Sequence, residues 1–397
     1  MPGKTDLEMR IRQIIIAMLA VLLCSCSGHD NEFPQTIRII SWGGIAADKA
    51  DTLYSLAREC GFDMHLGLYR AKESAVASMD AAARQGIEVI INFPQIKDST
   101  ETAVGQIKDH PALYAYHLKD EPDTADFRWL ESLCERIGEH DLEHPCYINL
   151  LPNWAWGADE YSDLIESFAS RIDVPFYSFD NYPVFKENGE VKVRHDWYRN
   201  LEEFSQMARR HDKPFWGFVL AKAHNISDPW PDTTYPEPTL GHIRLQVFSN
   251  LLYGAQAIQY FNFTGIVDPV TCEKLPAFDI IRQVNSEIKA YSRVFAGCEV
   301  LGVWHSGDTI PCGTKRLEAM PHAKIWSIDV AEGGAVIALI ENSGKTFLAL
   351  QNRDCINPAN IDVLFRSKVK LLTLEGEKRF DSESITLDPG EVVLFKM

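Results

Sequence analysis

Two hydrophobic patterns alternate along residues 37–297. Short apolar runs rich in β-branched and aromatic residues predict strands, and longer stretches with apolar positions every three or four residues predict amphipathic helices. The predicted strands cover residues 37–45, 62–69, 87–94, 113–122, 146–151, 174–182, 215–223 and 257–263. The predicted helices cover residues 48–60, 71–85, 100–108, 126–140, 159–171, 197–210, 239–253 and 278–295. Asp48 is expected to cap the first helix and Gly61 to end it, because Asp favours helix N-termini and Gly favours the position after a helix.

Strand and helix alternate eight times within about 260 residues, the typical size of a (β/α)₈ barrel. The other α/β architecture, a doubly wound open sheet, seldom shows eight strict alternations without a Gly-rich phosphate loop, and the sequence has no such loop. We therefore predict an α/β protein with a (β/α)₈ TIM barrel over residues 37–297.

After Gly297 the pattern changes to short alternating runs that are separated by turns such as Gly333-Gly334 and Pro389-Gly390. This pattern predicts a small antiparallel β-sandwich domain over residues 298–397. The segment contains no obvious catalytic constellation, so we expect a module for packing or for glycan contact.

The N-terminal residues have the pattern of a secretory signal. Arg10 and Arg12 precede an apolar run over residues 14–23, which is too short to span a membrane as a helix. The tetrad Leu23-Cys24-Ser25-Cys26 follows and resembles a bacterial lipobox. This resemblance implies that Cys26 carries a lipid, and ordinary cleavage without a lipid is the alternative.

The leader predicts where the protein acts. We expect a lipoprotein signal peptide over residues 1–26 and a polar linker over residues 27–36. Acidic residues soon after Cys26 resemble the export tag of surface lipoproteins in Bacteroides-like bacteria. We therefore expect an exported lipoprotein, held by its lipid anchor at the outer membrane or cell surface of a Gram-negative bacterium.

Charge and cysteine content narrow the range of partners. With 39 basic and 56 acidic residues the formal charge is −17, which disfavours nucleic acid and leaves neutral polymers such as glycans as natural partners. The nine cysteines form no CxxC pair and no cluster with histidine, which argues against a zinc site or a redox motif. Acidic and histidine residues also lack a recognisable ligand spacing, so we expect no metal and no cofactor.

The strongest candidate for chemistry is the run Asp120-Glu121-Pro122, at the end of the fourth predicted strand. A β/α barrel presents its catalytic groups at the C-terminal ends of its strands, and Asp180 ends the sixth strand in the same way. Alternation along the fourth strand places His117, Lys119 and Glu121 inside the barrel and Tyr114, Tyr116 and Leu118 outside. Asp120 is then expected to point sideways unless a bulge turns it.

The same alternation in the second strand predicts Met64, Leu66 and Leu68 outside and Asp63, His65 and Tyr69 inside. Ser178, Asp180 and Tyr182 share one face of the sixth strand. We expect His117, Lys119 and Asp63 to form a structural network below the site, because buried polar groups must be paired.

The run Tyr116-His-Leu-Lys-Asp-Glu-Pro122 resembles the acid/base signature of retaining glycosidases in clan A. The likeness is to family 42-type β-galactosidase barrels and to uncharacterised lipoproteins related to them. Ser178-Phe-Asp-Asn-Tyr-Pro183 and Leu252-Tyr-Gly-Ala-Gln-Ala-Ile-Gln-Tyr-Phe261 support it, and it covers residues 37–297. The resemblance implies a glycoside hydrolase with Glu121 as the general acid/base.

The sequence departs from that signature in two places. Asp120 stands where the clan has Asn, and Phe218-Val-Leu-Ala-Lys222 stands where the clan has its nucleophilic Glu, with no carboxylate before Asp228. Asp180 is one candidate for the second carboxylate, at about 5–5.5 Å from Glu121 in a retaining enzyme or about 6.5–9.5 Å in an inverting one.

Two other mechanisms stay open. The adjacent Asp120 and Glu121 resemble the pair of N-acetylhexosaminidase barrels, which implies that Asp120 orients the substrate's acetamido group, Glu121 protonates the leaving oxygen and Tyr182 assists. The remaining alternative is a glycan-binding lipoprotein without catalysis. Any role of Glu121 as an acid near neutrality requires that its pKa be raised by burial or by a nearby carboxylate.

Further residues at the predicted strand ends and loops are candidates for binding the carbohydrate. Tryptophans in the loops after strands one, five and seven offer faces for sugar stacking: Trp42, Trp154, Trp156 and Trp230. Polar candidates are Asp120, Tyr182, His65, Asn92, Asn153, Lys222 and Asn262.

Overall fold

The computed structural model describes residues 36–156, 160–225, 233–331 and 333–397. The predicted signal peptide, the lipidation site Cys26 and Trp230 lie outside the described residues. No helix within the described ranges has both the length and the apolar character that a membrane crossing requires.

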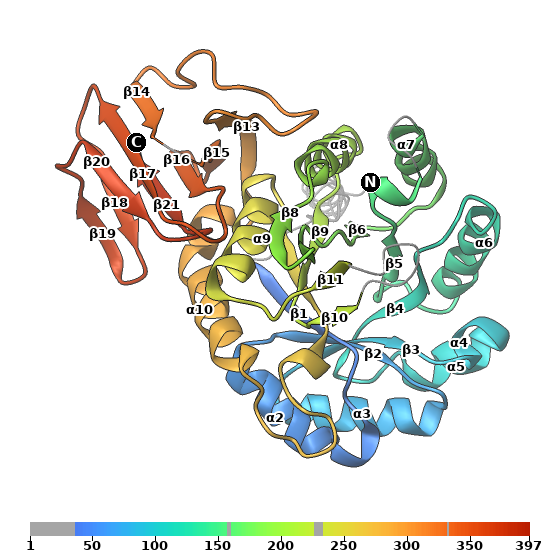
Figure 1. Cartoon of the computed structure of the whole chain (residues 1–397). Helices are drawn as coiled ribbons and strands as arrows, with labels where there is room; N and C mark the ends of the chain where they lie inside the picture. The colour runs from blue at the N-terminus through green and yellow to red at the C-terminus, as the bar shows by residue number, and fades with distance from the viewer. Residues whose placement is uncertain (1–35, 157–159, 226–232, 332) are drawn as a thin grey trace, which may run out of the picture. The chain divides into compact units, whose positions relative to one another are not determined.

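Eight parallel strands close into a barrel, as predicted (Figure 1). In barrel order from the first to the eighth they are β1 (Arg38–Trp42), β2 (Met64–Leu68), β3 (Glu88–Asn92), β4 (Leu113–Asp120), β5 (Cys146–Leu150), β6 (Tyr177–Phe179), β9 (Phe215–Leu220) and β12 (Ala257–Phe261). The pairing of β1 with β12 closes the ring, so that no strand of the barrel has a free edge.

Helices follow the barrel strands and surround them (Figure 1). They are α2 (Ala50–Cys60), α3 (Lys72–Arg84), α4 (Gln95–Asp98), α5 (Thr100–Ile107), α6 (Phe127–Gly138), α7 (Tyr161–Arg171), α8 (Trp197–Arg210), α9 (Leu240–Leu252) and α10 (Ala277–Phe295), with 3₁₀ turns η1 (Ala47–Lys49), η2 (Asn153–Ala155) and η3 (Phe263–Gly265). The predicted stop at Gly61 is confirmed, because its N–H closes α2 with a φ of 96°. The predicted Asp48 cap is wrong, because Asp48 lies within η1 and α2 has no side-chain cap.

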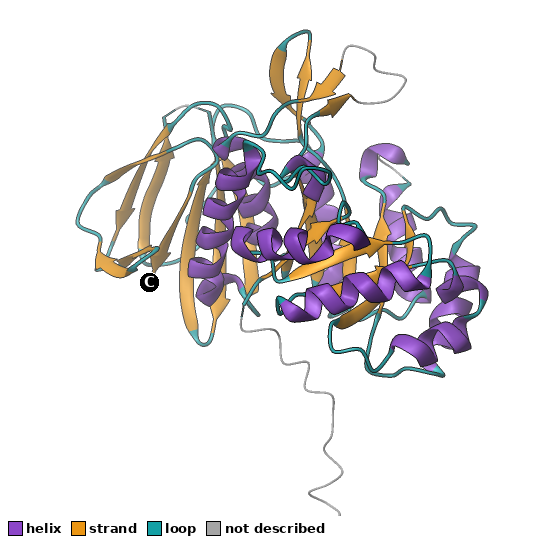
Figure 2. Cartoon of the chain, turned by 90° about the horizontal axis from the view of Figure 1, so that it is seen from below, coloured by secondary structure: helices purple, strands orange, loops and turns teal. Residues whose placement is uncertain are grey.

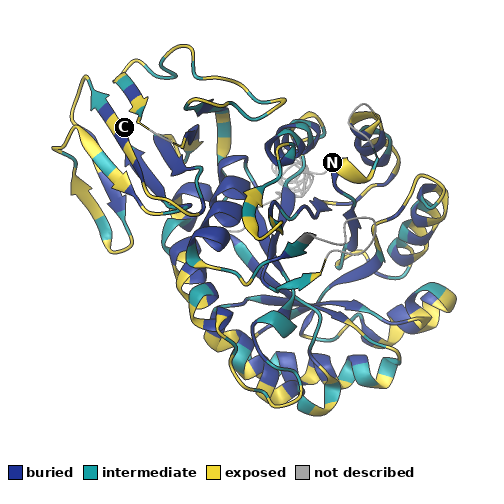
Figure 3. Ribbon diagram, in the orientation of Figure 1, coloured by how far each residue is buried: buried dark blue, intermediate teal, exposed yellow. Residues whose placement is uncertain are grey.

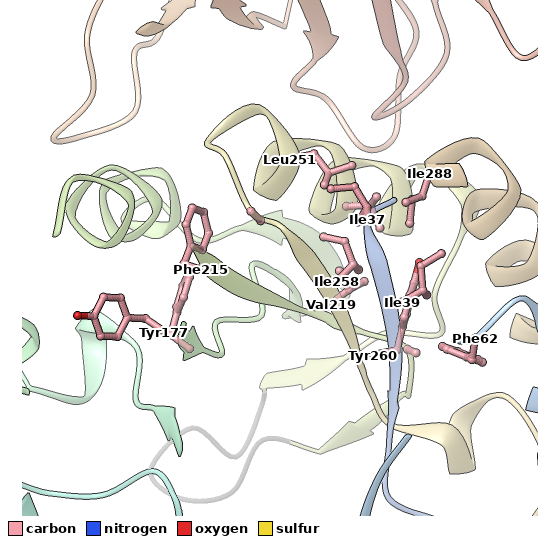
Figure 4. Close-up of a cluster of buried hydrophobic side chains, with 14 of the residues drawn as sticks. Ile37, Ile39, Phe62, Tyr177, Phe215, Val219, Leu251, Ile258, Tyr260 and Ile288 are labelled. Carbon is pink, nitrogen blue, oxygen red and sulfur yellow. The ribbon is translucent and has the colours of Figure 1, made fainter. Parts of the chain in front are cut away.

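Apolar side chains form two layers around the strands, and Figure 3 shows the strands and the inner faces of the helices as buried. The outer layer lies between strands and helices; Figure 4 shows part of it, with Ile39 and Ile258 on strands and Leu251 and Ile288 on helices. The inner cluster fills the barrel and comprises Ile40, Met64, Leu66, Ile90, Ala115, Tyr147, Phe176, Trp216 and Ala257.

The predicted facing of β2 is wrong. Met64 and Leu66 belong to the inner cluster, and His65 points outward, where its ring contacts Tyr54 of α2 and its Nδ1 lies 2.9 Å from the Ser41 hydroxyl. Asp63 forms ion pairs with Arg58 and Lys289 before β2 begins, so it belongs to no network with His117 and Lys119. In this strand both faces are apolar enough that alternation could not tell inside from outside.

Strand β4 contains two extra residues relative to its neighbours. The register with β3 shifts at Tyr114, which packs against the inner cluster instead of the helices. The register with β5 shifts at Leu118, which keeps the outward position that was predicted for it. Each extra residue reverses the facing of everything that follows, so alternation cannot be carried through this strand.

The C-terminal residues form antiparallel sheets, which confirms the predicted β-domain. One sheet has the order β13 (Glu299–Ser306), β15 (Ala335–Asn342), β16 (Lys345–Asn352), β21 (Val392–Lys396), β18 (Lys370–Thr373) and β19 (Gly376–Arg379). The other has the order β14 (Ile325–Val330), β17 (Ala359–Phe365) and β20 (Ser384–Leu387). The buried Gln351 side chain ties this domain to α9, where it accepts from the Ser249 hydroxyl at 2.7 Å.

A small sheet that the sequence analysis missed is built from the loops after β6 and β9. Its order is β10 (His224–Asn225), β11 (Thr233–Tyr235), β7 (Val184–Glu187) and β8 (Glu190–Val193), and Figure 2 shows these short strands projecting from the barrel. The turn between β7 and β8 is Asn188-Gly189, with φ of 51° and 85°, a pair that is typical of two-residue hairpins.

Close backbone contact at Gly241 should make the junction between barrel and β-domain sensitive to one methyl group. A Cβ there would clash with the Cys355 carbonyl oxygen and lie 2.7 Å from Pro389 Cβ. We expect Gly241→Ala to lower the free energy of unfolding by about 1–3 kcal/mol, measured by chemical denaturation. Gly105→Ala is the matched control, since Gly105 also lies in a helix but has no atom within 4 Å of the added group. Equal stability of the two variants would contradict the contact.

Candidate active site

Three carboxylates meet at the C-terminal rim of the barrel, where β4, β5 and β6 end. Asn149 of β5 donates through Nδ2 to Asp120 Oδ1 at 3.1 Å and to Asp180 Oδ1 at 2.9 Å. One nitrogen therefore binds both carboxylates. The distance between Asp120 Oδ1 and Asp180 Oδ1 cannot exceed the sum of these two hydrogen-bond lengths. The side-chain oxygen Oδ1 of Asn149 accepts from the Ser178 hydroxyl at 2.8 Å, which fixes the orientation of the side-chain amide.

The bulge in β4 turns Asp120 toward this cluster. Beyond Leu118 the register pairs Lys119 with Ile148 and Asp120 with Asn149, so Asp120 takes the facing of an interior residue. The prediction was that Asp120 points sideways unless a bulge turns it, and the structure has that bulge. Lys119 instead forms an ion pair with Asp126 at 2.8 Å.

Glu121 follows β4 in a strained backbone conformation. Its φ is 50°, in the left-handed region that costs a residue with a side chain about 1–2 kcal/mol. The next residue is Pro122, and the backbone N–H of Glu121 donates to the backbone carbonyl oxygen of Asn149 at 2.9 Å. Strain of this kind is concentrated at functional sites, where it fixes the direction of a side chain.

The cluster retains protons at a higher pH than isolated carboxyl groups do. Burial raises the pKa of Asp180 well above its usual range, and the charges of Glu121 and Asp120 add to this effect. Desolvation also raises the pKa of Asp120, and the pKa of Glu121 is raised by desolvation and then by Asp120, although both residues keep contact with solvent. The Asn149 hydrogen bond opposes the shift at Asp180, because it stabilises the ionised form.

Aromatic side chains form a wall beside the carboxylates. The Phe261 ring centroid lies 5.0 Å from that of Trp42 and 5.6 Å from that of Tyr182, so the wall joins the ends of β1, β6 and β12. Trp42 Nε1 is buried and has no hydrogen-bond partner among the described residues. The Tyr182 hydroxyl has its pKa raised by burial and then by Asp180, so it stays a donor.

The end of barrel strand seven carries a cation instead of a carboxylate. Lys222 Nζ donates to the Thr264 hydroxyl at 2.8 Å, and that hydroxyl donates to Asn262 Oδ1 at 2.6 Å. The Phe261–Asn262 peptide bond is cis. No Asp or Glu occurs between Phe218 and Asn225, and Asp228 lies outside the described residues.

Other predicted binding residues lie away from the carboxylates or in supporting roles. His65, which was predicted to contact sugar, has no exposed surface, and burial lowers its pKa to about 3. Asn153 is buried and donates to the Asp196 carbonyl oxygen. Trp156 packs against the outer layer, whereas Trp154 is 40% exposed under the Arg194 guanidinium.

A cleft of about 560 Å³ opens beside the cluster and includes Asp120 and Asn92 in its lining. Asn92 Nδ2 donates to the His117 carbonyl oxygen at 2.6 Å. A larger cleft of about 610 Å³ lies between the small sheet, the start of α9 and loops of the β-domain. Its lining includes none of Asp120, Glu121 and Asp180. Chemistry and not size therefore identifies the candidate site.

Sequence reasoning underestimated two features of this site. Asn149 lies on the fifth predicted strand, but its bridging role depends on the bulge in β4 and so could not be predicted. The cleft residues Lys97 and Trp129 come from α4 and α6, and no motif marks them.

Among the described residues, no three His, Cys, Asp or Glu side chains are grouped so that they could hold a metal ion.

Comparisons with known proteins support the fold. No family model and no curated protein matches the sequence. A glycoside hydrolase family 5 structure from Bacteroides vulgatus is 11% identical with a TM-score of 0.53, and the match covers 91% of this chain and 88% of that one. A β-galactosidase from Halorubrum lacusprofundi is 10% identical with a TM-score of 0.46, and the match covers 63% of this chain and 58% of that one. A glycosyl hydrolase family 2 member from Bacteroides cellulosilyticus is 9% identical with a TM-score of 0.42, and the match covers 91% of this chain and 58% of that one. The chain thus has a distant structural similarity to glycoside hydrolase barrels.

Because burial raises the pKa of Asp180, this residue should lower the free energy of unfolding by an amount that increases with pH. Above the pKa of an unfolded Asp, the unfolded chain loses this proton while the folded chain retains it, so folding becomes less favourable. We expect Asp180→Asn to raise the free energy of unfolding at pH 8 by about 1–3 kcal/mol, with a smaller gain at pH 4.5, measured by denaturation at both values. Asp173→Asn, at an exposed site paired with Lys213, should show no such gain. A loss of stability of the same size at both pH values would refute the electrostatic account.

Proposed function

We propose that this chain is a glycoside hydrolase that cleaves an oligosaccharide or polysaccharide at the carboxylate cluster. The observation that carries the proposal is the Asn149 amide, which holds Asp120 and Asp180 together beside Glu121. Glycoside cleavage needs two carboxyl groups that flank the scissile bond, and barrel enzymes place their chemistry at this rim. The distant likeness in fold to a family 5 glycoside hydrolase agrees with this function.

In the proposed mechanism Glu121 is the general acid/base and Asp180 is the second catalytic carboxylate. Glu121 lies nearer to solvent, where it can reach a leaving oxygen and exchange its proton. Asp180 must be ionised to act as a nucleophile or as a base, and the Asn149 hydrogen bond favours that form. In the free protein Asp180 holds a proton because burial raises its pKa strongly. The productive state that we propose is the other arrangement of that shared proton, with Asp180 ionised and the proton on Glu121. The aromatic wall of Trp42, Tyr182 and Phe261 supplies an apolar face for a sugar ring.

A second mechanism is favoured by the inward position of Asp120. In a substrate-assisted N-acetylhexosaminidase-like reaction, Asp120 would orient the acetamido group, Glu121 would protonate the leaving oxygen and Tyr182 would assist. The inward turn that the bulge in β4 gives Asp120 supports this role. This mechanism needs no nucleophile at the end of strand seven, where Lys222 stands.

We also propose that the protein is exported and anchored to the outer membrane or cell surface through a lipid on Cys26. The lipobox-like tetrad and the basic and apolar leader support this location.

Replacement of Glu121 by glutamine should remove the proton donor and keep the shape of the site. We expect kcat/KM on a cleaved glycan to fall by about 10²- to 10⁴-fold, measured by product release across a glycan panel. Glu135→Gln is the matched control, since Glu135 is exposed on α6, and it should keep full activity. Equal activity of Glu121→Gln and wild type would refute the assignment, and tight sugar binding without cleavage by the wild type would identify a glycan-binding protein.

The two mechanisms differ in what replaces Asp180. If Asp180 is the nucleophile, Asp180→Gly should lose activity by about 10²-fold or more and azide should restore turnover, because the anion can occupy the vacated position. If the substrate assists, activity should require an N-acetyl group and Asp120→Asn should be the more damaging change. Measurement of both variants on acetylated and non-acetylated substrates separates these outcomes.

A further inference from the structure

The cleft beside Asp120 has features that the catalytic proposal does not use. It lies between the ends of β2, β3 and β4 and helices α4 and α6. It is lined by Leu68, Asn92, Lys97, His117, Lys119, Asp120, Asp126 and Trp129. Because Asp120 belongs to both the cleft and the carboxylate cluster, a glycan bound at the cluster can extend into this cleft.

Lys97 supplies the cleft with a positive charge that no described residue neutralises directly. Its ammonium group lies 5.9 Å from the Trp129 ring centroid and forms no ion pair or hydrogen bond within the described part of the chain. The neighbouring Lys119 is different, because it forms an ion pair with Asp126 at 2.8 Å. In a chain with a formal charge of −17, a half-buried lysine of this kind is a ready partner for an anion.

His117 adds a polar group that is also left without a partner. The residue is 4% exposed, and neither ring nitrogen has a hydrogen-bond partner among the described residues. Burial lowers its pKa to about 3, so the ring is neutral and offers one donor and one acceptor. An unpaired buried donor or acceptor is costly, and a sugar hydroxyl in the cleft can pair with one of the two ring nitrogens, either as donor or as acceptor.

The cleft also has an apolar platform. Trp129 on α6 is 39% exposed and Leu68 at the end of β2 is 44% exposed, so both present apolar surface at the rim. A cation, a neutral imidazole and an exposed indole are together suited to a sugar ring that carries one negative group. A neutral sugar would leave Lys97 without a counter-charge.

We propose that this cleft is a subsite for a negatively charged sugar unit, with the carboxylate or sulfate of that unit on Lys97 and a hydroxyl on His117. This inference rests on the proposed function, because it assigns acidic glycans as the substrate class of the same site. A uronate and a sulfated sugar present the same anionic chemistry to Lys97, and paired ligands distinguish them.

The test compares ligands that differ only in charge. Calorimetry with the full chain carrying Glu121→Gln, which prevents turnover, would measure binding of oligogalacturonates and oligoglucuronates against their methyl esters, and of sulfated oligosaccharides against the desulfated forms. We expect at least one acidic form to bind roughly tenfold more tightly than its neutral partner at low salt. This gap should shrink with added salt.

Variants at Lys97 show whether this residue causes the preference. Lys97→Met should abolish it and Lys97→Arg should keep it, while Lys378→Met, which removes an exposed lysine from β19 with the same change in net charge, should leave it unchanged. Denaturation curves check that each variant folds; if Lys97→Met does not, the salt dependence and Lys97→Arg decide.

The results separate this inference from the proposed function. Acidic and neutral partners that bind equally or not at all, or a preference that survives Lys97→Met, would overturn the subsite. Glu121-dependent cleavage of neutral glycans without any acidic preference would overturn only the subsite. An acidic preference without cleavage by the wild type would overturn only the hydrolase.

Discussion

The side-chain amide of Asn149 is the interaction on which the arrangement of the rim depends. Its two N–H groups hold carboxylates from the strands on either side, and its carbonyl oxygen is held by the Ser178 hydroxyl. That hydroxyl accepts from Gln259 Nε2 at 2.8 Å and lies 2.9 Å from the Tyr147 hydroxyl. A polar layer therefore separates the apolar inner cluster below from the acidic groups above. Because every member is satisfied by another member, the layer can be buried without a large penalty.

The acidic groups above this layer are left without cations. Among the described residues no lysine or arginine forms an ion pair with Asp120, Glu121 or Asp180. Two nearby lysines have other partners, since Lys119 pairs with Asp126 and Lys222 donates to Thr264, and Lys97, which lines the same cleft as Asp120, forms no ion pair with it. A structural cluster would gain stability from a cation at this place, whereas a site that must hold a proton near neutrality would lose its function. The lack of a cation paired with these three carboxyl groups therefore supports a role for them in proton transfer.

The sequence predicted the barrel because its alternation of strands and helices depends on local patterns that repeat eight times. It predicted the rim position of Asp120, Glu121 and Asp180 because the predicted ends of the fourth and sixth strands, residues 122 and 182, lie close to the observed ends at Asp120 and Phe179. It could not predict which side chains of β4 face inward, because the extra residues Tyr114 and Leu118 depend on pairing with β3 and β5. The hairpin at Asn188-Gly189 was not predicted, because its short polar strands have no hydrophobic pattern that would mark them as strands.

The proposed position of the second carboxylate, at the end of strand six and not of strand seven, is compatible with barrel geometry. Glu121 follows β4 and Asp180 follows β6, with β5 between them, and adjacent strands lie about 4.8 Å apart. Two strand spacings set the backbone separation, and the inward turn of the side chains shortens the distance between the carboxyl groups. Asn149 lies on the intervening strand and draws Asp180 toward the Asp120 side. A carboxylate on strand six can therefore approach the Glu121 side of the rim, and Lys222 on strand seven is then free to hold Asn262 in place through Thr264.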